Sequence, residues 1–333
     1  MSAPIEPGAP RTTLFRHALR LHQAAPDAPL RRDGEPYPDD DLHRRHRPPA
    51  VGDRRLRGAE AARVLDRYFG DPGAPPSDLA DAFHAVDVPI RRNEHITAAA
   101  LRADRQRVRH TGRWLVRHST DRCSATIGLA LLATDSVEQD IPLIQTIGLL
   151  SDRFGSLAAD ALRRRSGGEE ALLWLAQRVG GWGRVDVVRA LCRQVTSLSR
   201  PWLLRHACDG DFLNGYFAGE VATAAHLHEA ADDPDDDLVD HTGLLLRTMA
   251  DCEGMGMSLS TYPPAPAVLT AHAAHVARQS PTADRYRTAE IIAGYLATRM
   301  PERNGCTPGQ RDRILRQYRD VLDRQAWRDV SHR

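Results

Sequence analysis

Apolar residues recur along most of the chain at the three- and four-residue spacing of amphipathic helices, and no β-rich segment interrupts them. Prolines stand at the first turn of several predicted helices, as in Asp140-Ile141-Pro142 and Thr307-Pro308. This pattern predicts an all-α protein. Helices are expected near residues 123–134, 140–151, 154–165, 169–179, 183–195, 200–208, 213–231, 236–251, 265–279, 283–299 and 308–326.

The beginning of the chain has a different pattern. Residues 1–57 are rich in proline and contain the charged runs PYPDDD and LHRRHRPP, with one short helix expected near Thr13 to Gln23. The sequence therefore predicts four regions. They are a largely irregular Pro/Arg-rich N-terminal arm (1–57), an N-terminal helical cap with a basic helix (58–119), helical repeats (120–326) and a C-terminal tail (327–333).

One long amphipathic helix is expected from about Ile96 to His118, because Leu101, Val108 and Leu115 recur every seven residues. Its opposite face carries arginines at spacings of three, four, four and four. They are Arg102, Arg105, Arg109, Arg113 and Arg117. Guanidinium groups in such a row can bind phosphate through paired donors, so this is a candidate nucleic-acid or anion site. A solvated helix face in an arginine-rich chain explains the same row.

Two neighbouring blocks of the chain are related. IGLLSDRFGSLAADALRR (147–164) can be laid over LAQRVGGWGRVDVVRALCR (175–193) at an offset of about 28 residues, and predicted helix pairs restart about every 30 residues. Together with RPWLLRHACDGDFLNGYFA, these segments resemble HEAT-like α-solenoid repeat proteins of bacteria, over roughly residues 120–300. The resemblance implies a right-handed α-solenoid of stacked antiparallel helix pairs with a concave surface. It carries no catalytic residue across.

Composition narrows the chemistry. The chain has no lysine, so all 45 Lys-plus-Arg residues are arginine, which argues against Schiff-base enzymes, GxxxxGK[ST] loops and kinases. Five cysteines without a CxxC pair indicate reduced thiols. No segment has the roughly 20 apolar residues of a membrane-spanning helix, and the N-terminus lacks a signal-peptide core. We therefore expect a cytoplasmic protein with no membrane partner.

Charge is unevenly distributed although the formal net charge is +1. Between His206 and Leu246 there is no arginine, and there are ten acidic residues. With the basic row upstream, this distribution allows a homo-oligomer to form through basic and acidic faces. A solvated loop explains the run DDPDDD equally well.

The motif HACDGD is a weak candidate for a metal site, because it combines imidazole, thiol and carboxylate groups. The four residues are His206, Cys208, Asp209 and Asp211. Their spacing matches no established site, and aspartates between two helices are more often caps. No metal or other cofactor is therefore predicted.

Three tryptophans in successive predicted repeats, Trp174, Trp182 and Trp202, are candidates for a concave aromatic surface. HEAT-like DNA glycosylases are understood to hold a damaged nucleotide on such a surface. Tryptophan is used more often to pack helices together.

The sequence contains no GxSxG, HExxH or CxxC motif, and no GxGxxG after a strand. The leading hypothesis is a non-enzymatic interaction or scaffold protein that binds a partner protein on a concave helical surface. The first alternative is a nucleic-acid-binding protein that uses the arginine row, with a HEAT-like DNA glycosylase as one form of it. The second is a metal-dependent enzyme centred on residues 206–211.

Overall fold

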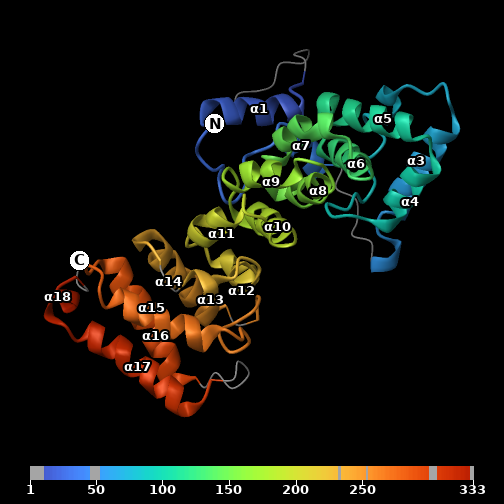
Figure 1. Cartoon of the computed structure of the whole chain (residues 1–333). Coiled ribbons are helices and arrows are strands. Elements are labelled where there is room, and N and C mark those ends of the chain that lie inside the picture. The colour runs from blue at the N-terminus through green and yellow to red at the C-terminus, as the bar shows by residue number, and fades with distance from the viewer. Residues whose placement is uncertain (1–10, 46–52, 232–233, 253, 300–305, 331–333) are drawn as a thin grey trace. The chain divides into compact units, whose positions relative to one another are not determined.

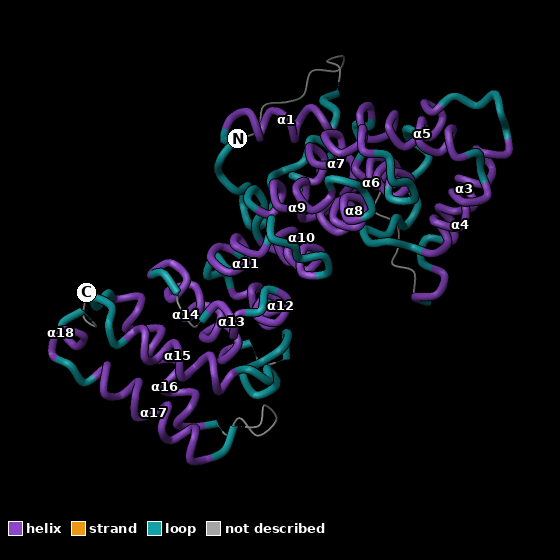
Figure 2. Tube along the Cα trace, in the orientation of Figure 1, coloured by secondary structure: helices purple, strands orange, loops and turns teal. Residues whose placement is uncertain are grey.

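The computed structural model describes residues 11–45, 53–231, 234–252, 254–299 and 306–330. Every regular element in these ranges is a helix, which confirms the predicted all-α class (Figure 2). Among them, no helix is both long enough and apolar enough to cross a bilayer. The chain divides into two compact units, a first unit, Met1–Ala190, and a second unit, Leu191–Arg333.

Several helices of the first unit contact both a neighbouring helix and the next helix but one (Figure 1). Thus α5 packs on α6 and α7 on α8, while α5 also contacts α7, α6 contacts α8, and α7 contacts α9. The helices are α1 (Leu14–Ala24), α2 (Asp40–Arg45), α3 (Ala59–Gly70), α4 (Glu94–Arg102), α5 (Arg105–His118), α6 (Arg122–Leu132), α7 (Ile141–Gly148), α8 (Ser151–Arg163), α9 (Gly168–Ala176) and α10 (Gly181–Cys192), with 3-10 turns η1 (Arg54–Leu56), η2 (Pro76–Leu79) and η3 (Glu138–Asp140).

The single long helix expected over 96–118 is wrong, because the chain breaks between α4 and α5. Ala103 is extended, and the Asp104 carboxylate accepts a hydrogen bond from the Arg107 N–H as the N-cap of α5. The break also changes the helical phase. Val108 and Leu115 are buried as expected, but the Leu101 side chain is 71% exposed. A heptad that spans a break no longer defines one face.

The N-terminal arm packs along the first unit wherever it is described. Its one expected helix is present as α1, which contacts α5 and α7 and buries Leu14 and Ala18 completely. The Leu14 N–H donates to the Ser119 carbonyl (3.1 Å), and farther along the Leu30 N–H donates to the Arg178 carbonyl (3.0 Å). The arm therefore belongs to the core of this unit.

Glycines set the closest helix contacts of the first unit. A Cβ on Gly112 of α5 would lie 3.0 Å from the Gly128 carbonyl oxygen of α6. A Cβ on Gly155 of α8 would lie 3.1 Å from the Gly183 Cα of α10. The two related sequence blocks therefore meet each other at equivalent positions, because only glycine allows such an approach.

The second unit shows the same alternation, since α12 contacts α14, α14 contacts α16, α13 contacts α15 and α15 contacts α17. Its helices are α11 (Arg200–His206), α12 (Ala218–Ala224), α13 (Leu227–Ala230), α14 (Asp236–Asp251), α15 (Ala265–Val276), α16 (Ala283–Thr298), α17 (Pro308–Leu322) and α18 (Gln325–Arg328), with η4 (Phe212–Tyr216). The predicted helix over 213–231 is wrong: it is η4, α12 and α13, separated at Phe217 and His226.

Helix starts follow the sequence signals in part. Thr307 begins α17 with a complete capping box, in which Gln310 returns the hydrogen bond. Asp140 stands before α7 as expected, but its side chain makes no capping bond. Trp327, at the start of the predicted tail, is 2% exposed and packs against Val321.

Candidate functional site

A groove of about 360 Å³ opens over α14, α15 and α16 in the second unit. Along α14, Asp240, Gly243 and Arg247 recur at spacings of three and four, which places them on one helix face. The remaining walls come from α15, the start of α16 and the turn after α11. They include His272, Val276, Thr282, Asp284, Arg285, Thr288, Asp209 and Gly210.

The floor of the groove is rigid and neutral. His272 is buried, and its Nδ1 lies 2.8 Å from the Tyr318 hydroxyl oxygen. Burial, reinforced by the charge of nearby His275, lowers the pKa of His272 to about 3, so the ring is uncharged at neutral pH. A Cβ at Gly243 would lie 2.7 Å from His272 Nε2, so glycine is required there for the ring to reach the groove.

The two arginines of the groove are held differently. Arg285 donates two hydrogen bonds to the Asp240 carboxylate, at 2.6 and 2.8 Å, and lies 3.6 Å from Asp236. Arg247 has one polar contact within the described residues, a 3.4 Å hydrogen bond to Thr288 Oγ1. Its guanidinium is half-buried and forms no ion pair there. The groove thus presents a cation with unused donors.

The turn over 206–211 is a capping structure. Asp211 accepts a hydrogen bond from the Leu213 N–H as the N-cap of η4, and Asp209 accepts one from Asn214 Nδ2. Cys208 is buried and its N–H donates to His241 Nε2, whereas His206 is exposed. In the described part of the chain, no close group of three metal-ligating side chains includes any of the four predicted residues.

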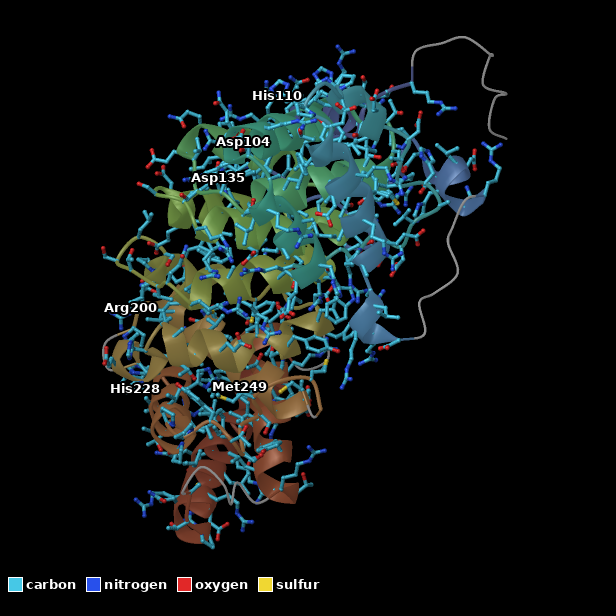
Figure 3. The ribbon with its side chains drawn as sticks, turned by 90° about the vertical axis from the view of Figure 1, so that its right-hand side faces the viewer. Asp104, His110, Asp135, Arg200, His228 and Met249 are labelled. Atoms are coloured by element: carbon cyan, nitrogen blue, oxygen red, sulfur yellow. The ribbon has the colours of Figure 1, made fainter. Side chains whose placement is uncertain are left out.

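The arginine row of the first unit is largely paired within the protein. Arg102, which lies on α4, forms an ion pair with Asp66. On α5, Arg105 and Arg109 both bind Asp135. Arg113 binds Asp140. Arg117 is exposed and has no partner among the described side chains. The common pattern is a guanidinium on α4 or α5 that reaches a carboxylate of the same unit. One of these carboxylates, Asp135, is labelled in Figure 3.

The carboxylates that bind this row are buried. Asp135 and Asp140 have side-chain exposures of 3% and 2%. Burial alone would raise the pKa of Asp135, but hydrogen bonds from Arg105 and Arg109 lower it to about 2. Arg165 lies between the same helices and donates to the carbonyls of Val137 and Leu132. These guanidiniums therefore hold helices together.

The three predicted tryptophans have different surroundings. Trp174 is half-buried, with His22 of the arm at its edge (5.3 Å between ring centroids) and the Arg178 guanidinium 4.4 Å over its ring. Trp182 is 42% exposed, and Trp202 lies in the second unit. The chain itself therefore covers Trp174, and the aromatic surface stays a prediction for the other two.

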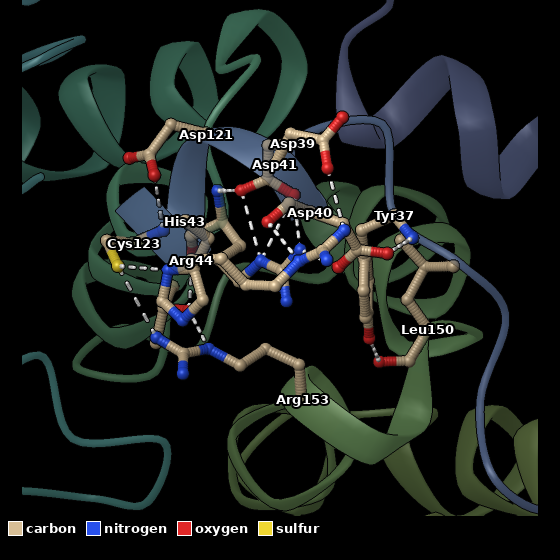
Figure 4. Close-up of polar contacts among 12 residues, drawn as sticks. Tyr37, Asp39, Asp40, Asp41, His43, Arg44, Asp121, Cys123, Leu150 and Arg153 are labelled. Atoms are coloured by element: carbon tan, nitrogen blue, oxygen red, sulfur yellow. Dashed lines mark hydrogen bonds and ion pairs between the residues drawn. The ribbon is translucent and has the colours of Figure 1, made fainter. Parts of the chain in front are cut away.

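A polar cluster that the sequence did not reveal attaches the arm to α6 and α8 (Figure 4). Arg122 donates three hydrogen bonds of 2.8 to 3.1 Å to the buried Asp39 carboxylate and also bonds Asp40. Its guanidinium lies 4.5 Å over the ring of Tyr37, whose hydroxyl donates to the Leu150 carbonyl.

Cys123 stands beside this cluster, 3.8 Å from His43 Nδ1 and 3.7 Å from an Arg153 nitrogen. Burial, reinforced by nearby Asp121, raises the pKa of Cys123 to about 12. A cysteine nucleophile reacts as the thiolate. The Cys123–His43 pair therefore lacks the ionisation that a cysteine nucleophile needs, and we interpret the cluster as structural.

The separation along the sequence between an arginine and an acid predicts many of these ion pairs. Arg105 and Asp135 are 30 residues apart, Arg113 and Asp140 are 27 apart, and Arg205 and Asp235 are 30 apart. These separations match the repeat offset, because one helix pair places its residues against the next. No comparable signal identifies Arg247, which forms no ion pair with the residues that the structure describes.

Comparisons of the chain with protein-family models, with curated proteins and with solved structures find no match. Its function therefore has to be argued from the geometry of its own residues.

Proposed function

We propose that this is a non-enzymatic cytoplasmic interaction protein that binds a partner protein through the groove over α14, α15 and α16. One observation carries the proposal: Arg247 lines a groove of about 360 Å³, and no carboxylate of the described residues binds it. A half-buried guanidinium without an ion partner keeps donors that are not used within the protein. It becomes useful when a ligand supplies the anion.

The alternating helix contacts within each unit support a solenoid of stacked helix pairs, as the resemblance to HEAT-like repeats implied. We propose the right-handed form, with the groove as part of its concave surface. Repeat cores supply rigidity in such proteins, and exposed side chains of the inner helices supply specificity.

The chemistry of the groove favours a peptide segment that presents a carboxylate. Arg247 and Thr288 offer N–H and O–H donors, and buried His272 keeps the floor neutral. Asp209 and Asp284 on the walls are exposed carboxylates. They would attract a nearby basic residue of the partner and repel a polyanion such as nucleic acid.

Selection of random peptides displayed on phage tests the proposal. We expect enrichment on the wild-type protein of peptides with an acidic residue or a free C-terminus, lost when Arg247→Ala is used. Arg287→Ala is the matched control, because Arg287 is an exposed arginine near the start of α16 that does not line the groove. Enrichment that survives Arg247→Ala would refute the groove as the binding site.

The nucleic-acid alternative has weaker support, because four of the five arginines in the row bind acids of the same unit. It makes a distinct prediction. Single-stranded DNA, duplex DNA or RNA should bind in a salt-sensitive way, and Arg109→Glu with Arg113→Glu should abolish binding. Fluorescence anisotropy at two salt concentrations separates the two functions. The alternative of a metal-dependent enzyme at residues 206–211 is weaker still, since Asp209 and Asp211 hold the turn.

A further inference from the structure

The turn between α12 and α13 has an unusual backbone. His226 adopts φ 51°, and among the residues that the structure describes it is the only one other than glycine with a positive φ. Glycine adopts this left-handed conformation freely, whereas it is energetically unfavourable for residues that have a Cβ. An observed outlier of this kind is a reason to look for a function.

Packing holds His226 in that conformation. Ala225 and Leu227, on either side, are completely buried. The His226 N–H donates to the Thr223 carbonyl (3.2 Å), and the His226 carbonyl accepts from the Glu229 N–H (3.1 Å). The imidazole is therefore presented to solvent from a fixed backbone.

Three metal-ligating side chains meet at this turn. His226, His228 and Glu229 are all exposed, and one ligand atom from each lies within 4.8 Å of the other two. His226 Nδ1 is 3.7 Å from Glu229 Oε1, and the two imidazole centroids are 6.0 Å apart. Two donors on one tetrahedral Zn²⁺ at about 2.0–2.1 Å lie roughly 3.4 Å apart. Small rotations of these three side chains would bring their ligand atoms to the spacing of a tetrahedral zinc site.

Arg200, at the start of α11, orients the carboxylate. It donates to the Ala225 carbonyl through Nε (2.9 Å) and lies 3.3 Å from Glu229 Oε2. Glu229 Oε1 is left directed at His226. Outer contacts that orient a ligand in this way are a regular feature of metal sites.

We propose that His226, His228 and Glu229 bind Zn²⁺ on the second unit. Imidazole and carboxylate groups are common ligands of Zn²⁺, which is intermediate between a hard and a soft cation. Three protein ligands leave the fourth tetrahedral position for water or for a group from a partner. The site is separate from residues 206–211 and from the groove. It goes beyond the proposed function.

Calorimetric titration of ZnCl₂ into the full-length protein, after treatment with EDTA, tests the proposal. We expect about one equivalent of Zn²⁺ per chain. His226→Gly and His228→Ala should each weaken binding at least tenfold, since each removes one ligand. His206→Gln should leave binding unchanged, because His206 is an exposed histidine of the same unit outside the cluster.

His226→Gly also separates ligation from folding. Glycine is favoured at a positive φ, so the metal-free variant should melt at the same temperature as the wild type or higher while binding is lost. Binding of less than a tenth of an equivalent would overturn the proposal. Equal binding by His226→Gly and the wild type would overturn it too, as would loss of binding in His206→Gln.

Discussion

Arginine has two uses in this molecule, and one example from each unit shows the contrast. In the first unit, Arg109 and Arg113 reach carboxylates that are 2% to 3% exposed, and Arg122 is bonded to buried Asp39. In the second unit, Arg247 lines a groove, and its one polar partner among the described residues is a hydroxyl. A guanidinium that binds a buried carboxylate holds helices together, whereas one without a carboxylate remains available to a ligand.

The comparison shows why a row of arginines is a poor guide to function in this chain. The row in the first unit is conspicuous in the sequence, but three of its arginines bind Asp135 and Asp140, which lie about one repeat farther on. A fourth, Arg102, binds Asp66. Arg247, the groove arginine that forms no ion pair with a described residue, has no sequence signature. Its availability depends on which acids the fold brings near it.

The largest expected effect is on the arm cluster of the first unit. Arg122→Ala leaves the Asp39 carboxylate, 2% exposed, without its side-chain partner. Removing one member of a buried pair costs about 3 kcal/mol. Urea unfolding should show this loss, and limited proteolysis should cut the arm sooner.

Arg44→Ala is the control. Both side chains of the pair Arg44–Asp41 are about three-quarters exposed, so the free energy of unfolding should change by less than about 0.5 kcal/mol. Equal effects would mean that the cluster does not hold the arm.

Asp135→Asn should cost about 2 kcal/mol, because the carboxylate loses two charge-assisted bonds from Arg105 and Arg109. The pKa of Asp135 is lowered to about 2, so the unfolded chain binds this proton more readily. The stabilisation is therefore complete above about pH 4 and is lost as the pH falls toward 2. Unfolding curves of the wild type and the variant should converge over that range. A difference that did not change with pH would show that the ion pairs are not its source.

The smallest effects come from glycines that differ between the units. Gly155→Ala in the first unit should cost about 1 kcal/mol, because the new Cβ lies 3.1 Å from the Gly183 Cα. Gly294→Ala on α16 of the second unit should stabilise by about 0.5 kcal/mol, since no atom lies within 4 Å of that Cβ and alanine favours a helix. Thermal melts check both signs. A stabilising Gly155→Ala would contradict the close approach of α8 and α10.

Much of the fold could be predicted because it follows from local patterns. The helical period and the pair Thr307-Pro308 predicted the start of α17, and the range predicted over 236–251 matches α14 to the residue. The helices predicted over 96–118 and 213–231 were wrong for local reasons that hydrophobic periodicity does not reveal. Asp104 caps a new helix inside an apparent heptad, and Phe217 and His226 interrupt a run of good helix formers.

The candidate sites were harder to predict because they depend on distant neighbours. Asp209 and Asp211 could be recognised as caps, since their partners lie within a few residues. Arg113 finds its partner, Asp140, 27 residues away in the sequence. The hydrogen-bond partner of Arg247, Thr288, is 41 residues away. The proposed zinc cluster is local in sequence, but its geometry depends on a left-handed backbone that only the folded chain shows.

The most direct test measures the affinity of one selected peptide, by fluorescence anisotropy, for three proteins: Arg247→Ala in the second unit, Arg113→Ala in the first, and the wild type. The account predicts at least tenfold weaker binding by Arg247→Ala, equivalent to about 1.4 kcal/mol or more, and binding within twofold of wild type by Arg113→Ala. Equal affinity of Arg247→Ala and the wild type would contradict the claim that the groove is the binding surface. Loss of affinity in Arg113→Ala alone would move the site to the arginine row.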